Sequence, residues 1–177
     1  MEKQAIIAVS GKSGCGNTTV SKIVSEKLGY NLINYTLRNL ASDLGISLEE
    51  LLVKTQSDSS FDFMLDKRQK EMALEGNSVV GSRLAIWLLP EATVRVYLYA
   101  DIETRAGRIH KREPTADFDQ ILSATQTRDF SDHERFNRLY SIDNSKYEFA
   151  DIIINTELYT PPQIADIIIS VFQIRGK

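Results

Sequence analysis

The chain has 177 residues and a formal net charge of −3 at pH 7, and 42% of its residues are hydrophobic, which suits one domain with its own core and excludes a disordered chain. The mildly acidic total argues against nucleic acid or an anionic membrane as partners held by bulk charge. A single cysteine, Cys15, permits no internal disulfide, no apolar run approaches the ~20 residues of a membrane span, and the start Met1-Glu2-Lys3-Gln4 is unlike a secretory leader. We therefore expect a soluble cytoplasmic protein with no membrane partner.

The elements predicted in chain order alternate between strands and helices. A buried strand over residues 5–9 runs into a glycine-rich loop, and a helix follows that ends before Gly29. After a short strand at 31–34 comes a helical excursion, in which Ser47 opens one helix with a capping box and a longer helix follows residues 58–60. The remaining strands are predicted at 78–81, 94–99 and 151–155, with a polar, arginine-rich helical region before the last of them.

The closing helix is marked by Thr160 as its cap and by Pro161, whose missing N–H costs nothing at a first helical position. Short buried strands alternating with helices specify an α/β fold with a parallel sheet and right-handed crossovers. The chain contains no repeat or linker, so we predict one domain over residues 1–177 with two helical insertions.

The glycine loop carries the first functional signal. It fits the phosphate-binding pattern G-x-x-x-x-G-K-[ST] at every position except the lysine, where Asn17 stands. Glycines let backbone N–H groups converge on a phosphate at a helix N-terminus, while the Thr18 hydroxyl would hold Mg²⁺. The predicted nucleotide-binding residues are Gly11, Ser13, Gly14, Cys15, Gly16, Asn17, Thr18 and Thr19. The alternative is a glycine-rich turn that binds nothing.

Asn17 removes a charge that the pattern normally supplies. A lysine there sits between the outer phosphates, whereas asparagine donates hydrogen bonds without neutralising charge. Lys12, the second residue of the loop, is the nearest substitute in the sequence, and we assign it as a candidate catalytic residue. The competing interpretation is an exposed, solvated lysine.

Eight of the eleven arginines lie between Arg83 and Arg138, and Arg is suited to forked recognition of phosphate. Arg105, Arg108 and Arg112 share one helix face with no interleaved acid. Such a face repels itself unless an anion arrives, which is typical of a mobile lid over phosphates. A solvated basic face is the alternative.

A second arginine set surrounds an acid. Arg128, Asp132 and Arg135 lie on one helix face, where Asp132 can either orient the two arginines or read a donor on a base. Arg83 directly follows a strand and is therefore expected at the ligand crevice, and Arg38 is a weaker candidate for the same anion. A plain ion-pair ladder within one helix would also explain this spacing.

Together these motifs resemble the cytidylate kinases, particularly the short archaeal and spirochaete forms. The resemblance covers nearly the whole chain and rests on residues 11–19, 66–71, 81–83, 105–113 and 128–135. It implies a P-loop NTPase fold in which a five-stranded parallel sheet is flanked by helices, with a monophosphate-binding helical region near 35–75 and an arginine lid near 101–115.

The implied reaction is transfer of the ATP γ-phosphoryl group to CMP or dCMP with Mg²⁺. By the same resemblance, Asp132 would help read the cytosine edge, the lid would supply Arg105, Arg108 and Arg112, and the acceptor phosphate would be held by Arg38, Arg83, Arg128 and Arg135. Two alternatives stay open: a nucleotide-binding regulatory module that lost catalysis with its lysine, and a kinase for another small acceptor. The sequence does not fix the oligomeric state.

Overall fold

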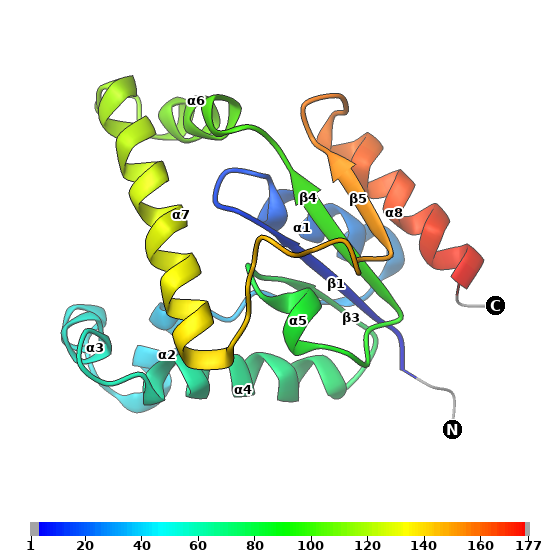
Figure 1. Cartoon of the computed structure of the whole chain (residues 1–177). Helices are drawn as coiled ribbons and strands as arrows, with labels where there is room; N and C mark the ends of the chain where they lie inside the picture. Colours follow the sequence, from blue (N-terminus) through cyan, green and yellow to red (C-terminus); the bar gives the residue numbers. More distant parts are fainter. Residues whose placement is uncertain (1–3, 176–177) are drawn as a thin grey trace.

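The computed structural model describes residues 4–175 and contains a five-stranded, wholly parallel sheet in the order β2-β3-β1-β4-β5 (Figure 1). This confirms the predicted fold class. The elements are β1 (Ile6–Gly11), α1 (Asn17–Leu28), β2 (Asn31–Ile33), α2 (Leu37–Leu44), α3 (Leu48–Thr55), α4 (Ser60–Leu74), β3 (Ser78–Gly81), α5 (Ala85–Leu88), β4 (Val94–Tyr99), α6 (Ile102–Arg112), α7 (Phe118–Tyr140), β5 (Ile152–Asn155) and α8 (Pro161–Arg175).

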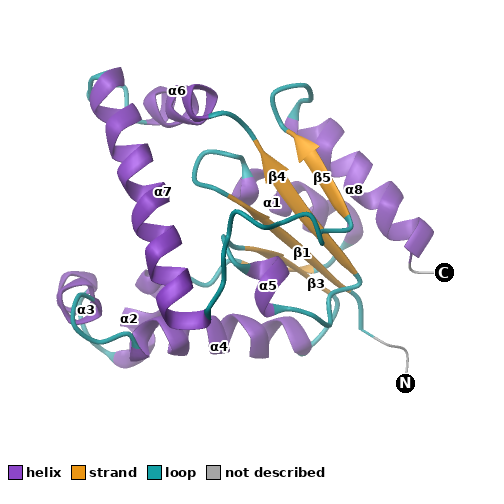
Figure 2. Ribbon diagram, viewed as in Figure 1, coloured by secondary structure: helices purple, strands orange, loops and turns teal. Residues whose placement is uncertain are grey.

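The central strand β1 is buried along its whole length because both of its faces are covered. Ile7 and Val9 point into the core that the sheet forms with α1 and α8, while Ile6 and Ala8 point into the core on the opposite face, which α4 and α5 complete. A continuous apolar run is therefore the expected sequence for this strand. Figure 2 shows helices on both sides of the sheet.

The helical excursion between β2 and β3 is confirmed, and its α2, α3 and α4 surround a small core of their own around Tyr35, Leu40 and Leu51. The helix start predicted at Ser47 is also confirmed, since the Glu50 N–H donates to Ser47 Oγ at 3.0 Å, although the return bond of the predicted capping box, from the Ser47 N–H to the Glu50 side chain, is not formed. The short helix α5 was not predicted, because four residues are too few for a helical period to show in the sequence.

The arginine-rich region between β4 and β5 forms two helices, α6 and the 23-residue α7. In Figure 1, α7 stands beside the sheet and faces the loop that joins β1 to α1. Because the strands are parallel, the loops that follow β1, β3 and β4 all leave the same edge of the sheet. That edge is where the predicted site residues should meet.

Candidate active site

The loop between β1 and α1 forms the floor of a cleft of about 920 Å³. Gly14 and Gly16 have φ angles of 85° and 100°, which favour glycine, and the Cys15 N–H closes a turn onto the Lys12 carbonyl at 3.1 Å. Burial raises the pKa of the Cys15 thiol to about 11, so this side chain stays neutral and acts as packing. The loop therefore has the strand, turn and helix context that phosphate-binding loops require.

The Asn17 side chain folds back onto its own loop. Its Nδ2 donates to the Gly11 carbonyl at 2.6 Å, and its Oδ1 is buried with no hydrogen-bond partner in the described part of the chain. Gly11 is packed too tightly to accept a side chain, because an added Cβ would lie 2.5 Å from the Leu98 carbonyl oxygen. Asn17 thus holds the loop closed and contributes no positive charge to it. The next two residues, Thr18 and Thr19, are exposed at the start of α1 and line the cleft.

Lys12 lies at the loop but is directed toward a carboxylate. Its Nζ is 3.5 Å from Asp129 Oδ2 on α7, and its side chain remains 41% exposed. A pair that is this long and this exposed is weak. Lys12 also lines the cleft, so its assignment as a catalytic residue stays a prediction.

Two of the three predicted lid arginines are bound to protein groups. Arg105, only 3% exposed, donates to both oxygens of Asp129 at 3.1 and 2.7 Å and to the Ser13 carbonyl at 3.1 Å. Arg108 donates to the Gly14 carbonyl at 3.2 Å and to the Thr156 hydroxyl and carbonyl, both at 2.8 Å.

The expectation that this arginine face has no partner until an external anion arrives is therefore wrong for Arg105 and Arg108, while their role at a phosphate stays a prediction. The physical reason is that α6 packs against the loop and α7, where carbonyl and carboxylate oxygens take the guanidinium hydrogens. Arg112, in contrast, is exposed and lines the cleft. It keeps the solvent access that a lid residue needs.

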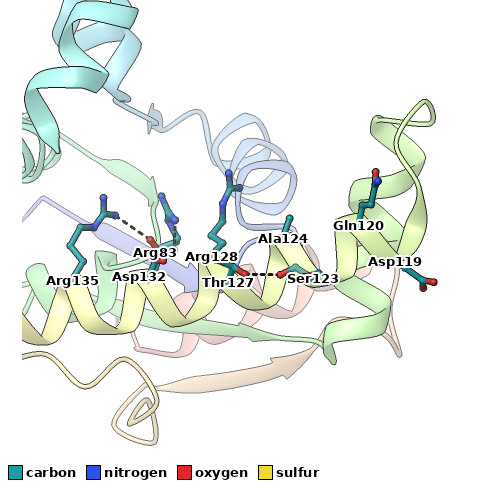
Figure 3. A pocket seen from close by; sticks show the side chains of 10 residues that line it. Arg83, Asp119, Gln120, Ser123, Ala124, Thr127, Arg128, Asp132 and Arg135 are labelled. Carbon is teal, nitrogen blue, oxygen red and sulfur yellow. Dashed lines mark hydrogen bonds and ion pairs between the residues drawn. The ribbon is translucent and has the colours of Figure 1, made fainter.

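The second arginine set lies along α7, where Arg83 joins it from the loop after β3 (Figure 3). Asp132, with a side chain only 12% exposed, forms ion pairs with Arg83 at the end of β3 and, at 3.2 Å, with Arg135 on its own helix. Arg135 also lies 3.4 Å from Asp62 of α4, so the set is more than a ladder within one helix. Asp132 orients two arginines, as one of the predicted alternatives has it, although its second partner is Arg83 and not Arg128.

Arg128 stands one turn away from Asp132 and is exposed. It donates a 3.4 Å hydrogen bond to the Ser13 hydroxyl of the loop. Arg38, which is also exposed, lines the same cleft as the loop and the other arginines. Beside this cleft, a second cavity of about 950 Å³ runs along α7 from Arg135 and Arg128 to Asp119.

Three polar residues that sequence reasoning left without a role also line the cleft. Asp62 and Asp66 are one turn apart on α4, and Tyr140 of α7 donates its hydroxyl hydrogen to Asp66. Burial raises the pKa of Asp66, with the neighbouring Asp62 adding to the shift, and burial beside Asp66 also raises the pKa of Tyr140. The spacing of four between the two acids was the available signal, since it places both on one helix face.

The comparison with protein families matches residues 6–158 to the Cytidylate kinase-like family. The chain belongs to this family. Among its relatives are the protein named cytidylate kinase 2 of Borrelia garinii subsp. bavariensis, 38% identical over 166 residues (92% of this chain and 93% of the relative), and the cytidylate kinase of Archaeoglobus fulgidus, 36% identical over 172 residues (96% and 95%). This cytidylate kinase-like protein is therefore a phosphotransferase of the nucleoside monophosphate kinase type.

Solved structures support the fold of the cytidylate kinase-like chain. A protein of Eubacterium ventriosum superposes with a TM-score of 0.70 at 22% identity, covering 96% of this chain and 99% of that one. Shikimate kinase from Acinetobacter baumannii, solved with shikimate, gives 0.65 at 16% identity, covering 98% and 95%. Identities this low indicate a shared P-loop kinase fold and nothing about the acceptor.

The cytidylate kinase-like site has a donor set that suits a magnesium ion carried by a nucleotide. Thr18 offers a hydroxyl oxygen at the cleft, while residues 4–175 contain no cluster of three or more His, Cys, Asp or Glu side chains that could hold a metal by themselves. Mg²⁺ commonly binds through one or two protein oxygens together with phosphates and water.

No helix in the described residues is long and apolar enough to cross a membrane.

Proposed function

We propose that the protein transfers the γ-phosphoryl group of ATP to CMP or dCMP with Mg²⁺, in a single domain whose helical insertions near 35–75 and 101–115 bind the acceptor and cover the phosphates. The observation that carries the proposal is that one cleft contains both the glycine loop and the arginines Arg38, Arg83, Arg128 and Arg135. A donor and an acceptor nucleotide would thus lie with their phosphates between the same walls.

The loop residues would bind ATP through their backbone N–H groups, with Thr18 holding the metal ion. Mg²⁺ would supply charge neutralisation on the phosphates. The exposed arginines Arg38, Arg83 and Arg128, with the partly buried Arg135, would hold the acceptor phosphate in line with the donor. No general base is required, because the attacking phosphate oxygen is already anionic and catalysis depends on position and charge.

Cations already present in the cleft would take over the charge that Asn17 lacks. Arg108 lines the cleft, and in residues 4–175 it is hydrogen-bonded to carbonyl and hydroxyl oxygens without a carboxylate partner, so its charge is not neutralised by an ion pair. Arg112 and Lys12 line the same cleft. Charge placed in advance at the site of a developing transition state is an effective form of catalysis.

Cytosine as the base is supported by the names of the relatives and by the acids at the acceptor end. Both oxygens of Asp132 are engaged by Arg83 and Arg135, which fits a role in orienting arginines better than one in reading a base. Asp66 receives one hydrogen bond, from Tyr140, within the described residues. A carboxylate with a remaining acceptor position would favour an amino-bearing base such as cytosine over uracil.

The test is ADP release in a coupled assay with CMP, dCMP, UMP and AMP as separate acceptors. We expect kcat/KM to be highest with CMP or dCMP, and the ratio of CMP to UMP to fall about tenfold in Asp66→Asn, because an amide can offer a hydrogen to the uracil carbonyl. Glu134→Gln, an exposed acid on α7, is the control and should leave the ratio unchanged.

Each adverse result has its own meaning. No turnover with any acceptor would refute the kinase proposal and favour the nucleotide-binding regulatory module. Turnover only with an acceptor other than a pyrimidine monophosphate would favour the alternative of a kinase for another small acceptor. An unchanged CMP to UMP ratio in Asp66→Asn would remove Asp66 from base selection.

A further inference from the structure

Asp129 of α7 joins three parts of the site that are far apart in the sequence. Its carboxylate accepts two hydrogen bonds from Arg105 of α6, at 3.1 and 2.7 Å, and lies 3.5 Å from Lys12 of the glycine loop. The residue before it, Arg128, contacts the Ser13 hydroxyl at 3.4 Å. The middle of α7 is thus attached to loop residues 12 and 13 both directly and through α6.

Arg105 transmits this attachment to the loop backbone. One of its nitrogens, Nη1, serves both the Asp129 carboxylate and the Ser13 carbonyl, each at 3.1 Å. The packing here leaves no spare room, because a Cβ on Gly14 would lie 2.9 Å from both the Cβ and the carbonyl oxygen of Arg105. A displacement of α7 cannot leave the loop unaffected while these contacts persist.

The same helix carries the arginines of the acceptor end. Arg128 precedes Asp129, and Asp132 and Arg135 follow within two turns, all on the 23-residue α7. Any movement that brings Arg128 and Arg135 onto an acceptor phosphate therefore also moves Asp129. The contacts of Asp129 lie on the loop side of α7, whereas Asp132 and Arg135 contact Arg83 and Asp62.

We propose that Asp129 is a positioning residue that couples nucleotide binding at the glycine loop to acceptor binding at α7, an inference that rests on the proposed function. A nucleotide that orders the loop fixes Lys12 and Ser13, and through Asp129 and Arg105 it holds α7 in the orientation that receives the acceptor. The coupling is reciprocal, so an acceptor raises nucleotide affinity by the same factor.

The experiment measures the dissociation constant of CMP by calorimetry, with and without a saturating non-hydrolysable ATP analogue. In the wild type we expect the analogue to tighten CMP binding on the order of tenfold, within the usual range for coupled sites. Replacing the buried pair by apolar residues, Arg105→Met with Asp129→Leu, avoids leaving an unpaired charge and should bring the factor to within about twofold of unity.

Further variants separate coupling from stability. If the double variant does not fold, Asp129→Asn takes its place in the experiment. This variant keeps the shape of the side chain and one acceptor for Arg105, and it should lose most of the coupling. Asp129→Glu should restore part of it. Asp151→Asn is the matched control, because Asp151 is also a largely buried acid that pairs with two basic side chains. Its partners are Arg95 at 3.5 Å and Arg175 at 2.7 Å, and it lies at the start of β5, away from the cleft.

The inference is overturned if the wild type binds both nucleotides with no mutual effect, if the folded double variant or Asp129→Asn keeps the wild-type coupling factor, or if Asp151→Asn reduces that factor as much as the changes at Asp129. Each of these results leaves the proposed function intact. Failure of the proposed function has a different signature: the wild type would then release no ADP with any acceptor in the coupled assay, whatever coupling its binding shows.

Discussion

Gly14 is the position where the packing of α6 against the glycine loop can be tested most sharply. Its φ angle of 85° disfavours any side chain, and an added Cβ would approach Arg105 at 2.9 Å from both the Cβ and the backbone oxygen and at 3.1 Å from the Cα. Backbone atoms cannot rotate aside, so the loop and α6 would have to separate. We therefore predict that Gly14→Ala is strongly destabilising.

Two other glycines allow the stability loss of Gly14→Ala to be separated into backbone strain and overpacking. Gly16 has a φ of 100° but open space around its Cβ position, so Gly16→Ala measures backbone strain alone, about 1–2 kcal/mol. Gly14→Ala adds overpacking of about 1–3 kcal/mol to the same strain, or about 2–5 kcal/mol in total. Gly107, inside α6 with nothing near its Cβ position, should gain about 0.5–1 kcal/mol when replaced by alanine.

The assay is the free energy of unfolding from urea denaturation of the three variants and the wild type. The expected order of stability is Gly107→Ala, wild type, Gly16→Ala and then Gly14→Ala. Equal losses in Gly14→Ala and Gly16→Ala would refute the reasoning, because the contact between α6 and the loop would then contribute nothing measurable.

Three further predictions concern the site. Arg128→Ala should lower kcat/KM for CMP by an amount that corresponds to about 2 kcal/mol of transition-state stabilisation. The Tm should not change, since the side chain is exposed, and Arg138→Ala on the same helix serves as the control. An unchanged rate in Arg128→Ala would remove Arg128 from the site. Asn17→Lys should change kcat/KM by less than about tenfold, because other cations line the cleft, and a gain of a hundredfold or more would instead indicate a decayed site. Burial raises the pKa of Asp66, so the folded protein binds this proton more tightly than the unfolded chain does; the resulting loss of stability is present above the folded pKa and is relieved as pH falls through it. Asp66→Asn should therefore have a higher Tm than the wild type at about pH 8, and the advantage should shrink as the pH is lowered to about 4, whereas an advantage that is equal at both values would contradict this assignment.

Much of the fold could be predicted because its signals are local. The apolar run of β1 requires cover on both faces, and the glycine loop and the Ser47 helix cap each depend on residues a few positions apart. The position of Arg83 at the ligand crevice followed from the rule that parallel strands end at one edge of the sheet. These inferences needed no knowledge of which helix packs against which.

The partners of the arginines could not be predicted for the opposite reason. Helical spacing shows that Arg105 and Arg108 share a face, but Asp129 is 24 residues from Arg105, and Thr156 is 48 residues from Arg108. Only tertiary packing brings them together. Likewise, Asp132 meets Arg83 across 49 residues, a contact that no periodicity within α7 reveals.

The central claim is that a loop without its lysine still supports phosphoryl transfer to a nucleotide. Its most direct test follows a radiolabelled γ-phosphoryl group from ATP during incubation of the purified protein with CMP and Mg²⁺. We predict that the label appears in CDP at a rate that depends on CMP concentration. Label found only in inorganic phosphate, or retained in ATP with every pyrimidine monophosphate tried, would contradict the claim.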